Sequence, residues 1–134
     1  MGNIFRTVKS TSYHFICDEI KYLSTSRDVI KEMGEPLIVE KGKVWIFAYL
    51  GTELVGFISY YAESIIYAYT MPEFRGKGVF SLLYSELPTD VEWNVTASNA
   101  SYPIFLKKGF TVIKNYSICH KLKLYVNGIN KKSN

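Results

Sequence analysis

The sequence has few cysteines and no long apolar run, and both absences restrict the class of protein. Cys17 and Cys119 stand alone, with neither a CxxC spacing nor a nearby pair of histidines. This pattern disfavours a metal site and a disulfide framework, so we expect reduced cysteines, no metal and a cytoplasmic location. No apolar run approaches the roughly 20 residues of a membrane-spanning helix, and the N-terminus lacks the apolar region of a signal peptide. We therefore expect no membrane partner.

Acidic residues are missing from the C-terminal part of the chain. Residues 101–134 contain seven lysines and no Asp or Glu, although the net charge of the whole chain is only +4. This excess of positive charge has three interpretations: a solvated surface, attraction for the phosphates of a cofactor, or a nucleic-acid interface. Because the same part contains no arginine, we favour the solvated surface.

Length and composition indicate a single globular domain. The chain has 134 residues, of which 48% are hydrophobic and 21% charged, enough to bury a core without disulfides. We place this domain at residues 1–126 and a flexible tail at 127–134. A monomer and a homodimer both fit these numbers.

Hydrophobic periodicity and turn residues predict an α/β fold with a mixed sheet, in the order β-α-α-β-β-β-α-β-α-β-β. Gly51-Thr52, between two apolar segments, predicts a β-hairpin. The segment 64–71 shows little polar alternation, which predicts a central strand covered on both faces. The predicted strands cover residues 4–8, 44–50, 53–61, 64–71, 91–98, 110–116 and 118–125.

Four helices are predicted between these strands. The first is capped by one of Ser10, Thr11 and Ser12, and the second begins at a Thr25-x-x-Asp28 capping sequence and ends at Gly34. The third follows residue 78 and stops at Pro88, and the fourth spans about 101–108. A polar loop is expected over 35–43.

One segment has the features of an anion-binding turn. In Pro72-Glu73-Phe74-Arg75-Gly76-Lys77-Gly78-Val79-Phe80, an apolar strand stops at a proline and a glycine-rich turn opens into a helix. The glycines let the backbone approach a ligand, and a helix start offers unpaired amides that suit a phosphate. Arg75 and Lys77 add positive charge. The segment fits neither the P-loop nor the dinucleotide-binding fingerprint.

The segment resembles the cofactor loop of the GNAT acetyltransferase superfamily, whose motif R/Q-x-x-G-x-G/A binds the pyrophosphate of acetyl-CoA. Residues 75–79 match this motif, whereas Phe80 replaces the Gly or Ala of the family. GTELVGF and FLKKGF fall at the β-hairpin and at the late helix-to-strand junction of the family, and the predicted element order is similar.

The resemblance implies that acetyl-CoA is the acyl donor and that the third central strand splays from the next one to admit its pantetheine arm. A backbone N–H of this strand then polarises the thioester carbonyl. The cofactor-binding residues implied in this way are Ala68, Tyr69, Thr70, Met71, Arg75, Gly76, Lys77, Gly78, Val79 and Phe80. Phe80 also fits the core of the helix.

The catalytic residues are less clear, because the sequence departs from the family here. A tyrosine often precedes the Phe of the GF pair by five residues and protonates the leaving thiolate, but this chain has Phe105. Tyr102 and Ser101, one turn earlier, are the candidate acids. Tyr102 also fits a surface or packing aromatic, and Ser101 fits a helix cap.

A general base is equally hard to place. Glu92, on the polar face of its predicted strand, is the candidate, and an ordered water is the alternative. His120 shares a strand face with Ile118 and Leu122, so we predict a hydrogen-bonded core imidazole there rather than a base.

Taken together, the resemblance implies an acetyl-CoA-dependent N-acetyltransferase. A primary amine of a small molecule or peptide would attack the thioester directly in a ternary complex. One alternative is a non-catalytic CoA-binding or interaction module with the same fold, which Phe80 and Phe105 motivate. Another is an acyltransferase acting on a nucleobase or nucleic-acid-linked amine, which the basic C-terminal part motivates.

Overall fold

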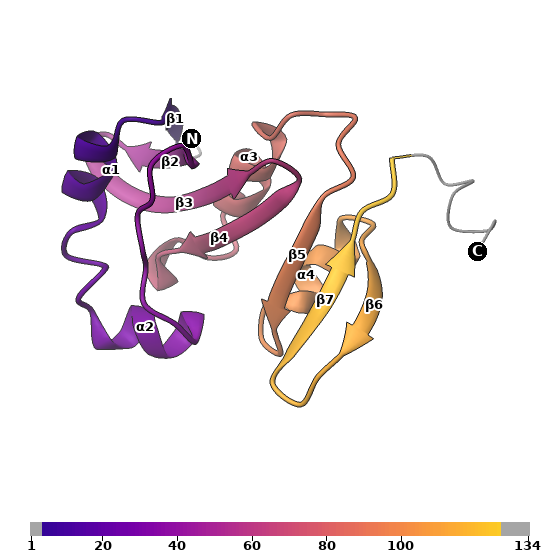
Figure 1. Cartoon of the computed structure of the whole chain (residues 1–134). Coiled ribbons are helices and arrows are strands. Elements are labelled where there is room, and N and C mark those ends of the chain that lie inside the picture. Colours follow the sequence, from indigo (N-terminus) through magenta and orange to yellow (C-terminus); the bar gives the residue numbers. More distant parts are fainter. Residues whose placement is uncertain (1–3, 127–134) are drawn as a thin grey trace. The chain divides into compact units, whose positions relative to one another are not determined.

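The computed structural model describes residues 4–126, so the predicted tail lies outside the described residues. Seven strands, four α-helices and one 3₁₀ helix form in this part of the chain (Figure 1). In chain order they are β1 (Arg6–Ser10), α1 (Tyr13–Ile20), α2 (Arg27–Met33), β2 (Val44–Leu50), β3 (Glu53–Tyr61), β4 (Ser64–Thr70), η1 (Pro72–Phe74), α3 (Val79–Ser85), β5 (Asn94–Ser98), α4 (Tyr102–Lys107), β6 (Thr111–Asn115) and β7 (Cys119–Lys123). The predicted order is confirmed, and only η1 was not predicted.

The strands follow the order β1-β2-β3-β4-β5-β7-β6, with β4 and β5 parallel and β2 and β3 antiparallel. The predicted mixed sheet and the hairpin at Gly51-Thr52 are therefore confirmed. The described residues form two compact units: 4–61 with 67–87, and 62–66 with 88–126. Strand β4 begins in the second unit and ends in the first. The single domain over 1–126 stays a prediction.

The core of the first unit is aromatic. The Trp45 ring centroid lies 5.9 Å from that of Phe47, 5.3 Å from that of Phe57 and 5.6 Å from that of Tyr67. All four side chains are buried. Aromatic rings of this size each bury about 150–250 Å², so this cluster fixes β2, β3 and β4 against one another.

Helices cover both faces of the β2–β3 hairpin. Phe47 contacts Phe15 of α1, with ring centroids 5.9 Å apart. The next residue, Ala48, points to the other face together with its partner Gly56 on β3. A Cβ on Gly56 would lie 3.0 Å from Cγ1 of Val79 in α3. Helices α1 and α3 therefore pack on opposite faces, which explains why the middle residues of both strands are buried.

Serine residues are the N-caps of the first two helices. Ser12, one of the three predicted caps, accepts a hydrogen bond from a backbone N–H of α1. Ser26 does the same for α2, so the predicted capping sequence from Thr25 is wrong. Thr25 cannot fill this position because its hydroxyl donates to the Tyr22 carbonyl. Gly34, at φ 83°, ends α2 as predicted.

Four strand starts differ from the prediction, those of β6 and β7 by one residue and those of β1 and β5 by more. Strand β1 begins at Arg6 rather than residue 4, because pairing with β2 sets Arg6 opposite Tyr49. Strand β5 begins at Asn94 rather than Val91, where pairing with Ser64 starts and the Asn94 N–H donates to the Glu63 carbonyl. Pairing partners, not the sequence pattern, therefore set these ends.

Strand β4 is central but is not equally covered on its two faces. Ile65, Tyr67 and Tyr69 are buried, whereas the residues between them are half-buried. The prediction of a strand covered on both faces is therefore wrong. The half-buried positions include Ala68 and Thr70, whose small side chains leave that face partly exposed.

The second unit packs α4 with β5, β7 and β6. Phe105 of α4 and Phe110 are buried with ring centroids 5.2 Å apart, and Leu122 is buried on β7. Ile118 is 76% exposed and precedes β7. The predicted apolar face therefore does not extend to Ile118, and His120 is half-buried rather than a core residue.

Candidate functional site

The end of β4 presents its backbone groups to two sides. The Met71 N–H donates to the Val55 carbonyl of β3 at 2.9 Å. Because backbone groups of a strand alternate in direction, the amides of Ala68 and Thr70 project from the opposite edge of β4. Among the four predicted backbone donors, only the amides of Ala68 and Thr70 therefore point away from β3.

The 3₁₀ helix η1 follows, and two further backbone amides donate hydrogen bonds within this turn. The Phe74 N–H donates to the Met71 carbonyl at 2.8 Å, and the Arg75 N–H donates to the Pro72 carbonyl at 3.3 Å. Gly76 and Gly78 then adopt φ 78° and 87°, values that only glycine adopts without strain. The turn therefore needs both glycines for its shape.

Helix α3 begins immediately after Gly78. The Leu82 N–H donates to the Gly78 carbonyl at 3.0 Å, and Gly78 stands at the cap position of the helix. Gly56 of β3 sets the depth of this helix, because a Cβ there would lie 2.9 Å from the Tyr69 carbonyl oxygen and 3.0 Å from Val79. The loop is thus anchored by a close approach of α3 to β3.

Arg75 already has partners within the first unit. Its Nη2 lies 2.5 Å from a carboxylate oxygen of Glu32 on α2, and its Nε donates to the Thr70 carbonyl at 2.9 Å. The guanidinium also lies over the Tyr69 ring, 5.3 Å from the centroid. Burial raises the pKa of the Tyr69 phenol above its ordinary value. Because Glu32 already pairs with Arg75, a phosphate ligand would compete with this carboxylate for the guanidinium.

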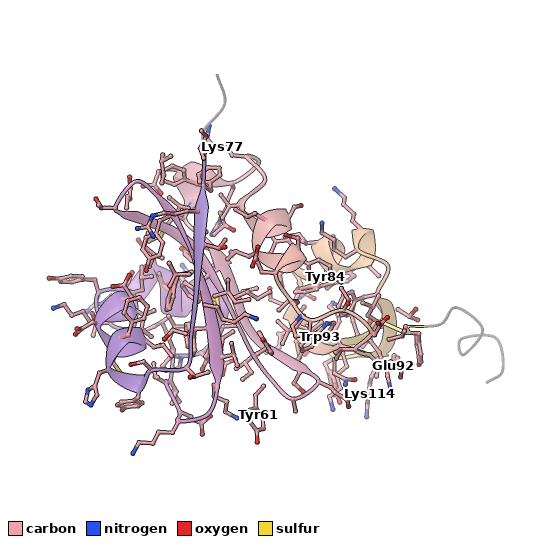
Figure 2. The ribbon with its side chains drawn as sticks, turned by 90° about the horizontal axis from the view of Figure 1, so that it is seen from above. Tyr61, Lys77, Tyr84, Glu92, Trp93 and Lys114 are labelled. Atoms are coloured by element: carbon pink, nitrogen blue, oxygen red, sulfur yellow. The ribbon has the colours of Figure 1, made fainter. Side chains whose placement is uncertain are left out.

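Lys77 and Phe80 complete the predicted loop. Lys77 is exposed and lies at the margin of the first unit, where Figure 2 labels it. Phe80 is half-buried and packs against Tyr84, one helical turn later, with ring centroids 5.9 Å apart. It therefore belongs to the flank of α3 rather than to the buried stripe of Val79 and Leu83.

The two candidate acids lie side by side in the second unit. Ser101 stands at the cap position of α4, but its side chain makes no capping bond. The Ser101 and Ser98 hydroxyl oxygens are 3.0 Å apart, and the Ser101 N–H donates to the Ser98 hydroxyl at 3.2 Å. Tyr102 is the first residue of α4 and is half-buried.

Glu92 is not brought together with these residues. Its carboxylate lies 3.6 Å from Nζ of Lys123 on β7, and Figure 2 shows it beside Trp93 in the second unit. Glu92 precedes β5, whereas Ser101 follows it, so the whole strand lies between them. At about 3.3 Å per residue, this separation is on the order of 13 Å, too far for both to act on one thioester.

His120 lies beside Tyr102 in the second unit, a contact that the sequence did not predict. Its ring centroid lies 4.0 Å from that of Tyr102, and its two nitrogens face Asn115 and Asn99. No local sequence pattern predicts this cluster, because its members lie on β7, on β6 and around the start of α4. The pairing of β6 with β7 places Asn115 directly opposite His120.

Two features that would indicate other functions are absent from the described residues. Residues 4–126 contain no group of three or more His, Cys, Asp or Glu side chains that could hold a metal ion. Within the same range, no helix is both long and apolar enough to cross a bilayer.

Sequence comparison and structural comparison give different results. No family model and no curated protein sequence matches the chain. Solved structures do resemble it. Escherichia coli ElaA has a TM-score of 0.69 and 13% identity, over 91% of this chain and 100% of that one.

Two further structures are named as acetyltransferases. A GCN5-related N-acetyltransferase from Rhodopseudomonas palustris has a TM-score of 0.62 and 14% identity, over 92% of this chain and 96% of that one. The PaiA N-acetyltransferase from Thermoplasma acidophilum, solved with coenzyme A, has a TM-score of 0.61 and 12% identity, over 89% and 98%. The chain therefore has the fold of the GNAT acetyltransferases.

Proposed function

We propose that this chain is an acetyl-CoA-dependent N-acetyltransferase in which the loop from Arg75 to Phe80 binds the cofactor pyrophosphate. The observation that carries the proposal is the pair of glycines at positive φ, Gly76 and Gly78, in a turn between β4 and α3 that also carries Arg75 and Lys77. The loop occurs in a fold that PaiA, a structure solved with coenzyme A, shares.

The proposed reaction is a direct transfer. The lone pair of a primary amine attacks the thioester carbonyl, the C–N bond forms, and the C–S bond breaks to release the CoA thiolate. The amides of Ala68 and Thr70 stabilise the oxyanion, because they project from the edge of β4 that does not pair with β3.

Two protons move in this reaction. Tyr102 gives its phenolic proton to the departing thiolate and regains one from solvent, while the amine loses its proton to water. Tyr102 is preferred to Ser101 because the Ser101 hydroxyl is already paired with Ser98. We leave Glu92 out of the chemical step, because it pairs with Lys123 and lies beyond the opposite end of β5.

The amine substrate is a small molecule or a peptide. The test measures thiol release from acetyl-CoA with a panel of primary amines, including a polyamine, an aminoglycoside and a peptide with a free N-terminus. We expect amine-dependent release by the wild-type protein and thermal stabilisation by millimolar acetyl-CoA. Absence of any stabilisation would contradict the proposal.

A second candidate function is a CoA-binding module without catalysis. The observation in its favour is Phe105, which is 3% exposed and packs on Phe110. The position that carries a tyrosine in many family members is therefore part of the core here. Acetyl-CoA binding without release of thiol on any amine would support this function over the enzyme.

A further inference from the structure

His120 is held by amides on two sides. Its Nδ1 lies 2.6 Å from Oδ1 of Asn115 on β6, and its Nε2 lies 2.7 Å from Oδ1 of Asn99, in the loop before α4. Asn115 and His120 are also directly paired across the two strands. The imidazole thus joins β6, β7 and the start of α4 within the second unit.

The amide of Asn99 determines which imidazole nitrogen carries a proton. Its Nδ2 donates to the Ser117 carbonyl at 3.2 Å. Turning this amide over would place Oδ1 against that carbonyl oxygen, so Oδ1 faces His120 and must accept from Nε2–H. Nε2 is therefore a donor.

Asn115 can satisfy the other nitrogen in either charge state of the imidazole. In the imidazolium form Nδ1–H donates to Oδ1, and in the neutral form the turned amide donates Nδ2–H to bare Nδ1. Both arrangements use both ring nitrogens. The orientation of the His120 ring is therefore fixed whether or not it is charged, and neither nitrogen is left to act as a base.

The fixed imidazole lies against Tyr102. The two ring centroids are 4.0 Å apart, with an angle of 38° between the planes. The backbone before Tyr102 is held as well, because the Ser101 N–H donates to both the carbonyl and the hydroxyl of Ser98. Pro103 follows directly and restricts the first turn of α4. The backbone that carries Tyr102 and the imidazole that contacts its ring are therefore both held in place.

We propose that His120 is a positioning residue that holds the Tyr102 ring, and with it the phenolic hydroxyl, in the orientation needed to protonate the leaving thiolate. This inference rests on the role of Tyr102 in the proposed function. A displacement of about 1 Å at a reacting group can cost about 100-fold in rate. Loss of the imidazole should therefore lower kcat without affecting cofactor affinity.

The first test is a double-mutant cycle. His120→Leu removes the ring and both hydrogen bonds, and is made in the wild-type and in the Tyr102→Phe background. We expect at least about a tenfold loss of kcat in the wild-type background, with KM for acetyl-CoA within about twofold, and less than a twofold further loss in Tyr102→Phe. An equal loss in both backgrounds, or no loss, would overturn the proposal.

Two further variants provide controls. Asn99→Ala removes the acceptor for Nε2–H without touching the imidazole, and should reproduce the loss of kcat if His120→Leu does not fold. His14→Leu is the matched control, because His14 also contacts a tyrosine but is exposed, with its ring centroid 6.0 Å from that of Tyr13. It should leave kcat unchanged.

A spectroscopic test needs no turnover. In a protein with ¹³C-labelled tyrosine rings, the Tyr102 signal is identified by its absence from Tyr102→Phe. It should move toward the position of free tyrosine in His120→Leu but not in His14→Leu; an unmoved signal would overturn the proposal. Failure of the proposed function looks different, because Tyr102→Phe then leaves kcat unchanged and there is no acid to position.

Discussion

The candidate site in the first unit is made of backbone, whereas that in the second is made of side chains. Gly76, Gly78 and the start of α3 are adjacent in sequence, and the shape of the turn follows from two positive φ angles. The cluster around Tyr102 takes Asn99, His120 and Asn115 from separate elements. One site depends on local conformation and the other on tertiary packing.

The two sites also differ in how charge is handled. Arg75 is held by a carboxylate, Glu32, and by the Thr70 carbonyl. The two ring nitrogens of His120 face the neutral amides of Asn99 and Asn115. An ionic contact on an exposed surface yields readily to a charged ligand, while a fully hydrogen-bonded imidazole holds its geometry. The proposed cofactor loop therefore carries an exposed ion pair that a ligand can displace, whereas the proposed acid lies beside a side chain of fixed geometry.

The largest expected effect concerns the side-chain site. Tyr102→Phe removes the proton donor, so kcat should fall by about 10²–10⁴-fold while the Kd for acetyl-CoA stays the same. Steady-state rates and calorimetric titration measure the two quantities. Tyr22→Phe, at a tyrosine that is 79% exposed in the first unit, is the control. An unchanged rate would remove Tyr102 from the mechanism.

The backbone site is tested by a matched pair of glycines. Gly78 and Gly42 have φ of 87° and 88°, and an added Cβ would meet nothing within 4 Å at either position. Each change to alanine should therefore cost about 1–2 kcal/mol of folding stability. Only Gly78→Ala should also weaken acetyl-CoA binding, by about tenfold. Equal cofactor affinities in the two variants would show that the turn does not bind the cofactor.

A smaller effect is expected at Glu32. Glu32→Gln frees Arg75 for phosphate, so acetyl-CoA should bind about two- to fivefold more tightly, in line with the modest strength of exposed ion pairs. Glu40→Gln breaks another exposed pair, with Lys43 at 3.9 Å, and should leave binding unchanged. Weaker binding in Glu32→Gln would mean instead that Glu32 orients Arg75 for the ligand.

The smallest effect is expected at Glu92. Because this carboxylate pairs with Lys123 and lies away from Tyr102 along β5, Glu92→Gln should change kcat by less than about twofold. The pH dependence of kcat should also be the same as in the wild-type protein. A loss of kcat by a factor of 100 or more, with the basic limb of the pH profile moved, would identify Glu92 as the base after all.

The sequence predicted the fold well because its determinants are local. The hairpin at Gly51-Thr52, the end of α2 at Gly34 and the glycine turn before α3 each depend on residues within one or two turns of chain. The start of β5 at Asn94 could not be predicted, because pairing with Ser64 sets it. The cap at Ser26 was missed because Thr25 and Ser26 are chemically equivalent choices.

The candidate site was predictable only in its backbone half. The motif indicated the loop. It could not show that the Met71 N–H donates to the Val55 carbonyl or that Arg75 forms an ion pair with Glu32. The His120 cluster was misread as core, since alternation places His120 and Leu122 on one face but gives no information about Asn99. Such contacts arise from the way the strands and α4 pack.

The most direct test compares two ligands by calorimetric titration of the wild-type protein. Coenzyme A carries the pyrophosphate that the loop from Arg75 to Phe80 is proposed to bind, whereas pantetheine has the same thiol arm without it. We predict that coenzyme A binds at least about 100-fold more tightly than pantetheine, a difference of about 2.8 kcal/mol. Equal affinities, or no binding of coenzyme A, would contradict a pyrophosphate site at this loop.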